Sequence, residues 1–362
     1  MPGKAPHRAG RARPAAWRRA LVLLAALVVA LLLGEVAVRL VRPQDLTGSF
    51  RVQSPGRGQL INRASGRAQH QLGDRIVEYR FDGRHLRGSA ASPDGAPVLL
   101  LGDSFTFGVL LDEPDTYASQ LGQRADAAFG KDRVEILNGG VSGFGLANMV
   151  ALLEEYGDSL RPELVVVFFN GGDIQRSVDA GLYTLDEHGE LQAHDLPPRR
   201  LKSFVNAIPG YAWLLEHSHL LQLARRVMVP KPTRAPDEGP PAAPEPDTAA
   251  DLGRALFVRL HAWCDARDIE LLVLTTGYQD SPHFGSQRYP SQRFLEQAPA
   301  FFREQGIEFH DLAPALLRQS DGDWDAISIA GDGHPNERGA RVVAELAWPR
   351  LEPLLRRMVE SR

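Results

Sequence analysis

A serine at a sharp turn from a strand into a helix exposes its hydroxyl and directs its own backbone N–H at the same point. Ser104 has this setting, because Gly102-Asp103-Ser104-Phe105 directly follows the apolar run 98–101. Gly102 and Gly108 would permit the turn and the close approach of a substrate. A Gly-Asp-Ser tripeptide alone is also an ordinary turn. Ser104 is therefore a candidate nucleophile whose partners must be sought elsewhere in the chain.

A nucleophilic serine needs a base, and the histidine best placed for this is His334. It lies in Gly331-Asp332-Gly333-His334, just before the last long helical pattern. The carboxylate of Asp332 can accept the imidazole Nδ1–H, which fixes the tautomer and stabilises the imidazolium. His310, which is followed by Asp311, is a rival base.

Two further loops offer hydrogen-bond donors for an oxyanion. The segment 138–145 contains four glycines, whose unhindered amides suit this task, although such a segment is also typical of a flexible loop. Asn170 follows the apolar run 164–169 and could add a side-chain amide. The alternative is that Asn170 bonds the local backbone and shapes the turn.

These segments follow apolar runs that alternate with helical patterns. The expected strands are 98–101, 134–137, 164–169, 271–274 and, more weakly, 307–310. The expected helices are 116–128, 146–156, 252–266, 291–305 and 335–357. Continuous apolar strands separated by helices predict an α/β fold with a parallel sheet covered on both faces. Ligands bind such sheets at the carboxyl ends of the strands, where the loops with Ser104 and Asn170 meet.

An insertion at about 175–250 interrupts this pattern. It contains an expected hairpin at 181–189, an apolar helix near 212–228 and a proline-rich linker at 230–247. The linker composition predicts an extended segment.

The amino terminus has the pattern of a membrane signal. A basic segment, 1–19, precedes the uninterrupted apolar run 20–33, and Glu35 would lie near the far interface. A cleaved signal peptide shares these features, but Gly34-Glu35-Val36-Ala37 has a charge where cleavage requires small residues. We therefore expect an uncleaved transmembrane signal anchor at 20–40. By the positive-inside rule, 1–19 is cytoplasmic, and the body lies outside the cytoplasmic membrane. Residues 41–95 are expected to form a stem and a small hairpin.

The charge of the body limits its partners. Residues 43–362 carry 33 basic and 44 acidic side chains and no basic stripe, which argues against nucleic acid as a partner. The single cysteine, Cys264, excludes an intrachain disulfide and a cysteine-based metal cluster. The histidines lack metal-ligand spacing, so neither a metal nor a cofactor is expected.

In order and spacing, the segments with Ser104, the glycine-rich loop, the third-strand loop and Asp332-Gly333-His334 resemble the four sequence blocks of the SGNH/GDSL hydrolases. The resemblance covers about 72–360 without much of the insertion. It implies a flavodoxin-like, three-layer α/β/α hydrolase domain at 96–362. It also implies a serine-dependent acyl-ester hydrolase, with Ser104 as nucleophile and N–H donor. Gly143 would supply a second N–H, His334 would be the base, and Asp332 its partner.

Two positions depart from this family pattern. The third block usually reads Gly-x-Asn-Asp, whereas this chain places Gly172 at the amide position and Asn170 two residues earlier. The family's acid often lies three residues before the histidine, where this chain has Gly331. Asp332 resembles a variant of membrane-tethered members, and the alternative acids are Asp321, Asp323 and Asp325.

Three functions are compatible with these residues. The first is an extracytoplasmic esterase that removes an acyl group, acetyl among the candidates, from a glycan or lipid. The second is a polysaccharide O-acyltransferase, in which a sugar hydroxyl replaces water. The third is a non-catalytic binding protein on the same fold, which Gly172 favours and the set Ser104, Asp332 and His334 opposes.

Overall fold

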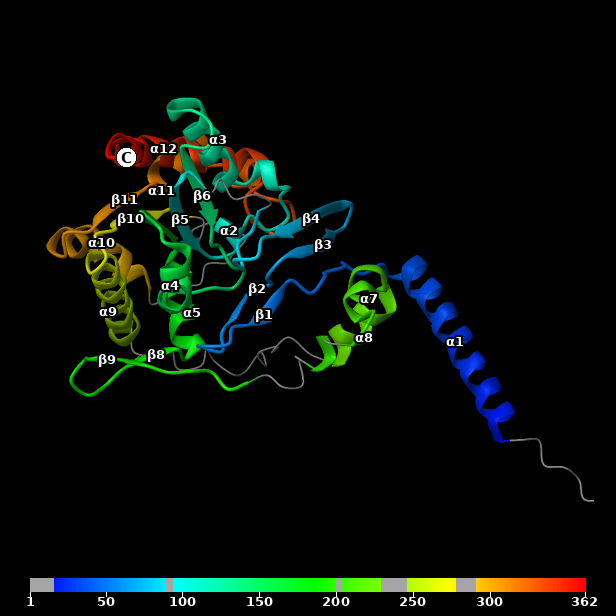
Figure 1. Cartoon of the computed structure of the whole chain (residues 1–362). Helices are drawn as coiled ribbons and strands as arrows, with labels where there is room; N and C mark the ends of the chain where they lie inside the picture. The colour runs from blue at the N-terminus through cyan, green and yellow to red at the C-terminus, as the bar shows by residue number, and fades with distance from the viewer. Residues whose placement is uncertain (1–15, 89–93, 199–203, 207, 229–245, 278–290) are drawn as a thin grey trace, which may run out of the picture.

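The computed structural model describes residues 16–88, 94–198, 204–206, 208–228, 246–277 and 291–362. Its centre is a parallel five-stranded sheet with the order β11-β10-β7-β5-β6 (Figure 1). The strands are β5 (Ala96–Gly102), β6 (Val134–Asn138), β7 (Leu164–Phe169), β10 (Glu270–Thr275) and β11 (Glu308–Asp311). Each coincides with one of the expected apolar runs, and the α/β fold class is confirmed.

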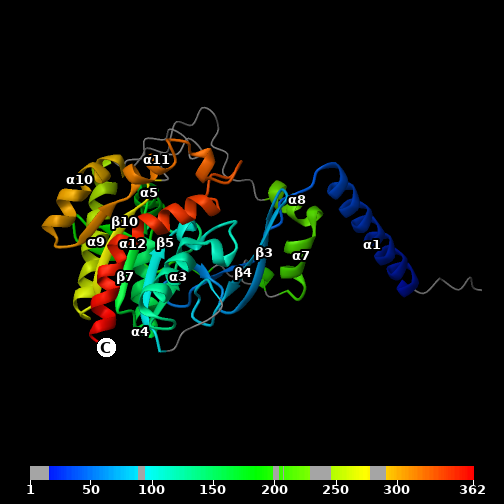
Figure 2. The ribbon, with the colours of Figure 1, turned by 90° about the horizontal axis from the view of Figure 1, so that it is seen from above.

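Helices cover both faces of the sheet because successive strand residues point to opposite sides. Leu99 and Leu101 pack in one core layer, and Val98 and Leu100 pack in the other. The first layer is closed by α4 (Leu146–Leu160), α5 (Gly171–Ala180), α9 (Pro246–Asp265) and α10 (Ser291–Glu304). The second is closed by α3 (Tyr117–Phe129), α11 (Ala313–Gln319) and α12 (Glu337–Glu360), as Figures 1 and 2 show.

Two antiparallel hairpins precede the sheet, where the sequence indicated one. They pair β1 (Arg51–Gln53) with β2 (Leu60–Asn62), and β3 (Gly66–Leu72) with β4 (Arg75–Phe81). The second hairpin belongs to a separate small core, in which the buried ring of Tyr79 packs edge-on against Phe107 at a centroid distance of 4.8 Å. The segment before the sheet thus contacts the turn that follows β5.

The insertion contains the expected hairpin, β8 (Tyr183–Leu185) with β9 (Leu191–Ala193). The helix expected at 212–228 is two helices, α7 (Tyr211–His217) and α8 (His219–Met228), because Ser218 between them has extended backbone angles. Of the proline-rich linker, 230–245 lies outside the described residues.

Helix α1 (Ala16–Val41) stands apart from the body and is long and apolar enough to cross a membrane. None of its residues is buried. Its C-terminal end lies beside α7 and α8 (Figure 1).

The guanidinium of Arg87 is buried between the β3–β4 hairpin and the turn after β5. It donates to the carbonyl oxygens of Phe107, Gly108 and Leu111 and lies 4.7 Å from the ring centroids of both Tyr79 and Phe107. Burial lowers the pKa of Arg87 to about 10, so the group stays protonated at neutral pH. Phe107 is the last residue of the short helix α2 (Ser104–Phe107) and Gly108 is its C-cap, so no further helical turn supplies donors to their carbonyls. Gly108 O also accepts from the backbone N of Leu111 at 3.2 Å.

We expect Arg87→Met to destabilise the fold, because Met keeps the length of the side chain but removes every donor. Gly108 O keeps the backbone N–H of Leu111, but the carbonyls of Phe107 and Leu111 lose their donor. Each buried acceptor left without a donor costs about 1–3 kcal/mol, so the free energy of unfolding should fall by at least about 2 kcal/mol. Urea unfolding followed by circular dichroism would measure this. The control is Arg80→Met, since Arg80 is 48% exposed and pairs with Glu78, and its loss should stay below about 1 kcal/mol. Equal losses in the two variants would contradict this account of Arg87.

Candidate active site

Ser104 begins α2 directly after the carboxyl end of β5. Asp103 caps this helix, because its Oδ1 accepts from the backbone N of Phe105 at 2.9 Å. Gly102 is required at the strand end, since a Cβ there would lie only 1.8 Å from Thr106 Oγ1. The turn ends at Gly108, which has a φ of 76°. The sharp turn expected around Ser104 is therefore present.

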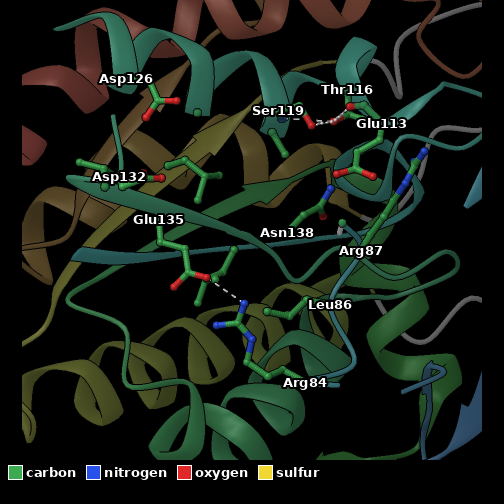
Figure 3. A pocket seen from close by; sticks show the side chains of 16 residues that line it. Arg84, Leu86, Arg87, Glu113, Thr116, Ser119, Asp126, Asp132, Glu135 and Asn138 are labelled. Atoms are coloured by element: carbon green, nitrogen blue, oxygen red, sulfur yellow. Dashed lines mark hydrogen bonds and ion pairs between the residues drawn. The ribbon is translucent and has the colours of Figure 1, made fainter. Parts of the chain in front are cut away.

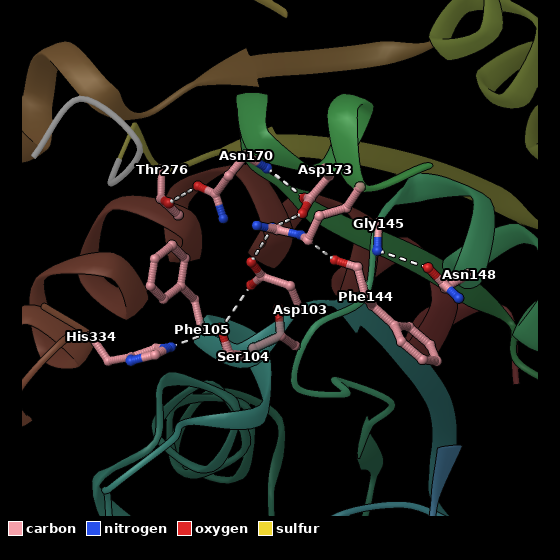
Figure 4. Close-up of polar contacts among 12 residues, drawn as sticks. Asp103, Ser104, Phe105, Phe144, Gly145, Asn148, Asn170, Asp173, Thr276 and His334 are labelled. Carbon is pink, nitrogen blue, oxygen red and sulfur yellow. Dashed lines mark hydrogen bonds and ion pairs between the residues drawn. The ribbon is translucent and has the colours of Figure 1, made fainter. Parts of the chain in front are cut away.

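His334 and Asp332 lie beside Ser104 and form a continuous hydrogen-bonded row with it. Figure 4 shows the part of this row that joins His334 to Ser104. His334 Nε2 is 2.8 Å from Ser104 Oγ, and His334 Nδ1 is 2.5 Å from Asp332 Oδ1. The ring of Phe105 packs edge-on against the imidazole at 5.3 Å. Gly331 and Gly333, with φ of 76° and 92°, allow the tight loop that directs Asp332 back toward His334.

The carboxylate of Asp332 is held ionised. Burial raises its pKa, but hydrogen bonds from the side chain and backbone of His334 outweigh burial and keep the pKa below its ordinary value. An ionised Asp332 can accept the Nδ1–H of His334, which leaves Nε2 to accept a proton from Ser104.

The other candidate base and acids have different contacts. His310 lies on the edge strand β11, and its Nε2 is 3.1 Å from Glu308 Oε1. Asp323 Oδ1 accepts from the backbone N of Asp325 and of Ala326 and so caps a short 3-10 helix. Neither contact involves the imidazole of His334.

The glycine-rich loop after β6 packs directly on the Ser104 turn. Asn138 Nδ2 donates to Thr106 O, and its Oδ1 accepts from the backbone N of Gly140, both at 3.0 Å. A Cβ on Gly140 would lie 2.3 Å from Phe107 N, so this close approach requires glycine. Gly143 has a φ of 85°, a backbone conformation that favours glycine.

Asn170 lies at the end of β7 and is almost fully buried. Its Oδ1 accepts from Thr276 Oγ1 at 2.8 Å, and its backbone N donates to Asp173 Oδ2 at 2.8 Å. Because Thr276 occupies the oxygen, the amide nitrogen points the other way, toward the side where Phe105 and Ser104 lie (Figure 4). Among the residues that the structure describes, Nδ2 has no hydrogen-bond acceptor.

Gly172 lies in the first turn of α5, a helix that the sequence did not indicate because two glycines open it. A Cβ at Gly172 would lie 3.2 Å from Arg176 Nη1, so the guanidinium of Arg176 fills the adjacent space. Arg176 bridges the buried carboxylates of Asp103 and Asp173 and donates to Phe144 O at 2.7 Å. Burial and the nearby Asp103 raise the pKa of Asp173 to about 7, against the opposite effect of Arg176.

Arg176 and Thr276 are site residues that the sequence reasoning missed. Thr276 directly follows β10, so the strand-end rule that singled out Ser104 and Asn170 would also have found it. Arg176 follows Asp173 by one helical turn, a signal that depends on first identifying α5.

Two cavities are lined in part by residues of the loop and strand around β6. One of about 270 Å³ is lined by Gly143, Phe144 and Arg176, next to the candidate oxyanion donors. The other, of about 160 Å³, lies along edge strand β6 and is lined by Arg84, Arg87 and Asn138 among others (Figure 3). Ser104, Asp332 and His334 line neither of these two cavities.

Several solved structures are similar to this chain at low sequence identity. A lipolytic protein of the G-D-S-L family from Veillonella parvula is 16% identical, with a TM-score of 0.41. The match covers 70% of this chain and 96% of the Veillonella chain. TesA is 17% identical, with a TM-score of 0.43 and coverages of 71% and 99%. Axe2, an acetylxylan esterase from Geobacillus stearothermophilus, is 14% identical, with a TM-score of 0.41 and coverages of 71% and 94%.

A search of curated proteins found no match. The model of the GDSL-like lipase/acylhydrolase family matches residues 100–342, which include Ser104, the loops after β6 and β7, Asp332 and His334. The chain therefore belongs to the GDSL-like lipase/acylhydrolase family and is a hydrolase of ester bonds.

Proposed function

We propose that the chain is a membrane-anchored serine esterase whose catalytic residues are Ser104, His334 and Asp332. The observation that carries this proposal is the hydrogen-bonded row in which Ser104 Oγ lies 2.8 Å from His334 Nε2, with Asp332 on the opposite ring nitrogen. A non-catalytic binding protein would not need this alignment.

Ser104 Oγ attacks the acyl carbonyl carbon while His334 Nε2 takes the hydroxyl proton. Asp332 stabilises the imidazolium through Nδ1–H. The imidazolium then protonates the leaving alkoxide, so that an alcohol departs and an acyl-serine remains. A water molecule, deprotonated by His334, attacks the acyl-serine, releases the carboxylic acid and restores the Ser104 hydroxyl.

The tetrahedral intermediate carries an oxyanion that needs donors. We assign this role to the backbone N–H groups of Ser104 and Gly143 and to Asn170 Nδ2. Support for Asn170 comes from Thr276, whose hydroxyl occupies Oδ1 and so directs the amide nitrogen into the site. Asn170 thus takes the place of the amide that the family pattern puts at the position of Gly172.

We propose hydrolysis of the acyl-serine rather than acyl transfer to an acceptor, because the matched family is one of acylhydrolases. An acceptor hydroxyl in place of water would turn the same steps into an acyl transfer to a glycan. An assay on an acetylated sugar, with and without an acceptor glycan, separates the two by the product formed.

We further propose that α1 is an uncleaved anchor and that the body lies on the extracytoplasmic side. Arg18 and Arg19 at its N-terminal end favour the cytoplasm by the positive-inside rule. Glu35, near the other end of α1, accepts from Ser218 Oγ at 2.8 Å and from Leu220 N at 2.9 Å. Cleavage between Glu35 and the body would remove this contact, which supports the anchor over a cleaved signal peptide.

The nucleophile assignment predicts that a fluorophosphonate probe labels Ser104. Labelling should disappear in Ser104→Ala and persist in Ser142→Ala, a matched change on the neighbouring glycine-rich loop. Mass spectrometry of the labelled peptide would identify the site. Undiminished labelling of Ser104→Ala would show that another residue is the nucleophile.

The acid assignment predicts that Asp332→Asn lowers kcat by about 10⁴, because the amide cannot stabilise the imidazolium and favours the wrong tautomer. The matched control is Asp325→Asn, which changes the rival acid and should leave kcat near the wild-type value. Steady-state hydrolysis of p-nitrophenyl acetate measures both. The reverse result, a severe loss only in Asp325→Asn, would move the acid to Asp325.

The donor assignment predicts that Asn170→Ala lowers kcat by about 10²–10³ with little change in KM, since the oxyanion exists only near the transition state. Thr276→Val keeps the side-chain shape but loses the hydrogen bond that orients the amide, and it should lower kcat by about tenfold. If Thr276 acts through Asn170, the Thr276→Val change should have no further effect in the Asn170→Ala background. Additive losses would contradict this coupling.

A further inference from the structure

Helices α7 and α8 expose large apolar side chains on one side of the insertion. Trp213 and Val227 are 60% and 69% exposed, and Met228 is 71% exposed. Phe204 and Ile208, which precede α7, are also exposed. A contiguous exposed apolar patch usually marks a surface that contacts a membrane or another protein.

Helix α8 separates apolar from polar side chains around its axis. At 100° per residue, Leu220, Leu223 and Val227 share one face with Leu221, Ala224 and Met228. Gln222, Arg225 and Arg226 lie on the opposite face. An amphipathic helix with basic residues on its polar side is typical of helices that lie in the plane of a membrane interface.

The body contacts one polar side chain of each helix, whereas Arg225 and Arg226 on the polar face of α8 are exposed. Gln222 Nε2 donates to Thr47 O at 3.3 Å, and Glu216 Oε1 accepts from the backbone N of Gln69, on β3, at 3.0 Å. Leu220, at the start of the apolar face of α8, packs beside α1, since a Cβ at Gly34 would lie 3.2 Å from Leu220 Cδ2. Val227 and Met228, at the end of this face, are exposed.

Glu35 holds the start of α8 at a defined position along the axis of α1. Its carboxylate accepts from the first backbone N–H groups of α8, those of His219 and Leu220, at 3.0 and 2.9 Å. Arg39, one turn further along α1, donates to His217 O at 2.8 Å. Glu35 comes just after the apolar run 20–33, so α8 begins where α1 would leave the hydrocarbon core.

We propose that α7 and α8 form a membrane-interface element, whose apolar face enters the boundary between headgroups and acyl chains of the bilayer that α1 spans. The occupant of this face is lipid, because the face continues the unburied apolar surface of α1 at the level set by Glu35. Trp213 suits the interface, where indole rings concentrate, and the exposed Arg225 and Arg226 carry the charge that anionic headgroups attract. This proposal rests on the proposed anchoring by α1.

Spin labels on single introduced cysteines in the full chain test the proposal. Cys264 is the only native cysteine, and burial raises its thiol pKa to about 12, so it stays unlabelled. Labels go on Val227→Cys, on Leu27→Cys in the middle of α1 as the reference for lipid, and on Val258→Cys on α9 as the reference for water. Val258 is a matched control, because it is also an exposed valine on a helix.

The chain is reconstituted in vesicles of phosphatidylcholine and phosphatidylglycerol, and collision rates with oxygen and with a water-soluble nickel chelate are measured. Oxygen concentrates in lipid and the chelate in water. The ratio of oxygen to chelate collisions at Val227 should shift from the Val258 value toward the Leu27 value. A ratio equal to that at Val258, with Leu27 in lipid, would overturn the interface element and leave the anchor intact.

Two other outcomes also overturn the proposal. Protection of the Val227 label from both probes would mean that protein, such as a second copy of the chain, covers the face. A Leu27 label with the collision ratio of Val258 would show that α1 does not span the bilayer, and the anchoring itself would then be rejected.

Discussion

The buried guanidinium of Arg87 is the contact on which the geometry around Ser104 depends. Helix α2 has a single turn, so its last carbonyls cannot find donors within the helix. Arg87 supplies them, and its backbone N donates to Asn138 O on the edge strand. One residue thus joins the β3–β4 hairpin, the sheet edge and the turn that contains Ser104. The segment expected to be a stem therefore supports the site directly.

The architecture could be predicted because the strands are short, continuous apolar runs bounded by turn residues. The run 164–169 is an example, since every residue of β7 is buried, as expected for an inner strand of a parallel sheet. Helix α5 could not be predicted in the same way, because Gly171 and Gly172 have low helix propensity. The helix forms there because Ile174 packs in the core below. Tertiary packing outweighs local preference at this position.

A candidate site residue could be predicted where its local segment indicates its role. It could not be predicted where a residue distant in the sequence sets its orientation. Ser104 and His334 were proposed as site residues from local segments, and a hydrogen bond joins them in the structure. The orientation of Asn170 depends on Thr276, 106 residues later, so its own sequence neighbourhood contains no sign of it. Likewise, the glycine at position 172 is explained only by Arg176, which lies against it.

The 230 residues that separate Ser104 from His334 also bear on when activity can arise during synthesis. The chain emerges from its amino terminus, so α1 is available for insertion before the sheet is complete. Strand β5 and Ser104 follow early, whereas His334 emerges only after β10 and β11. Under the proposed assignment, a nascent chain has a serine without a base and is inert. Hydrolysis then begins only late in synthesis, after the proposed anchor α1 has emerged.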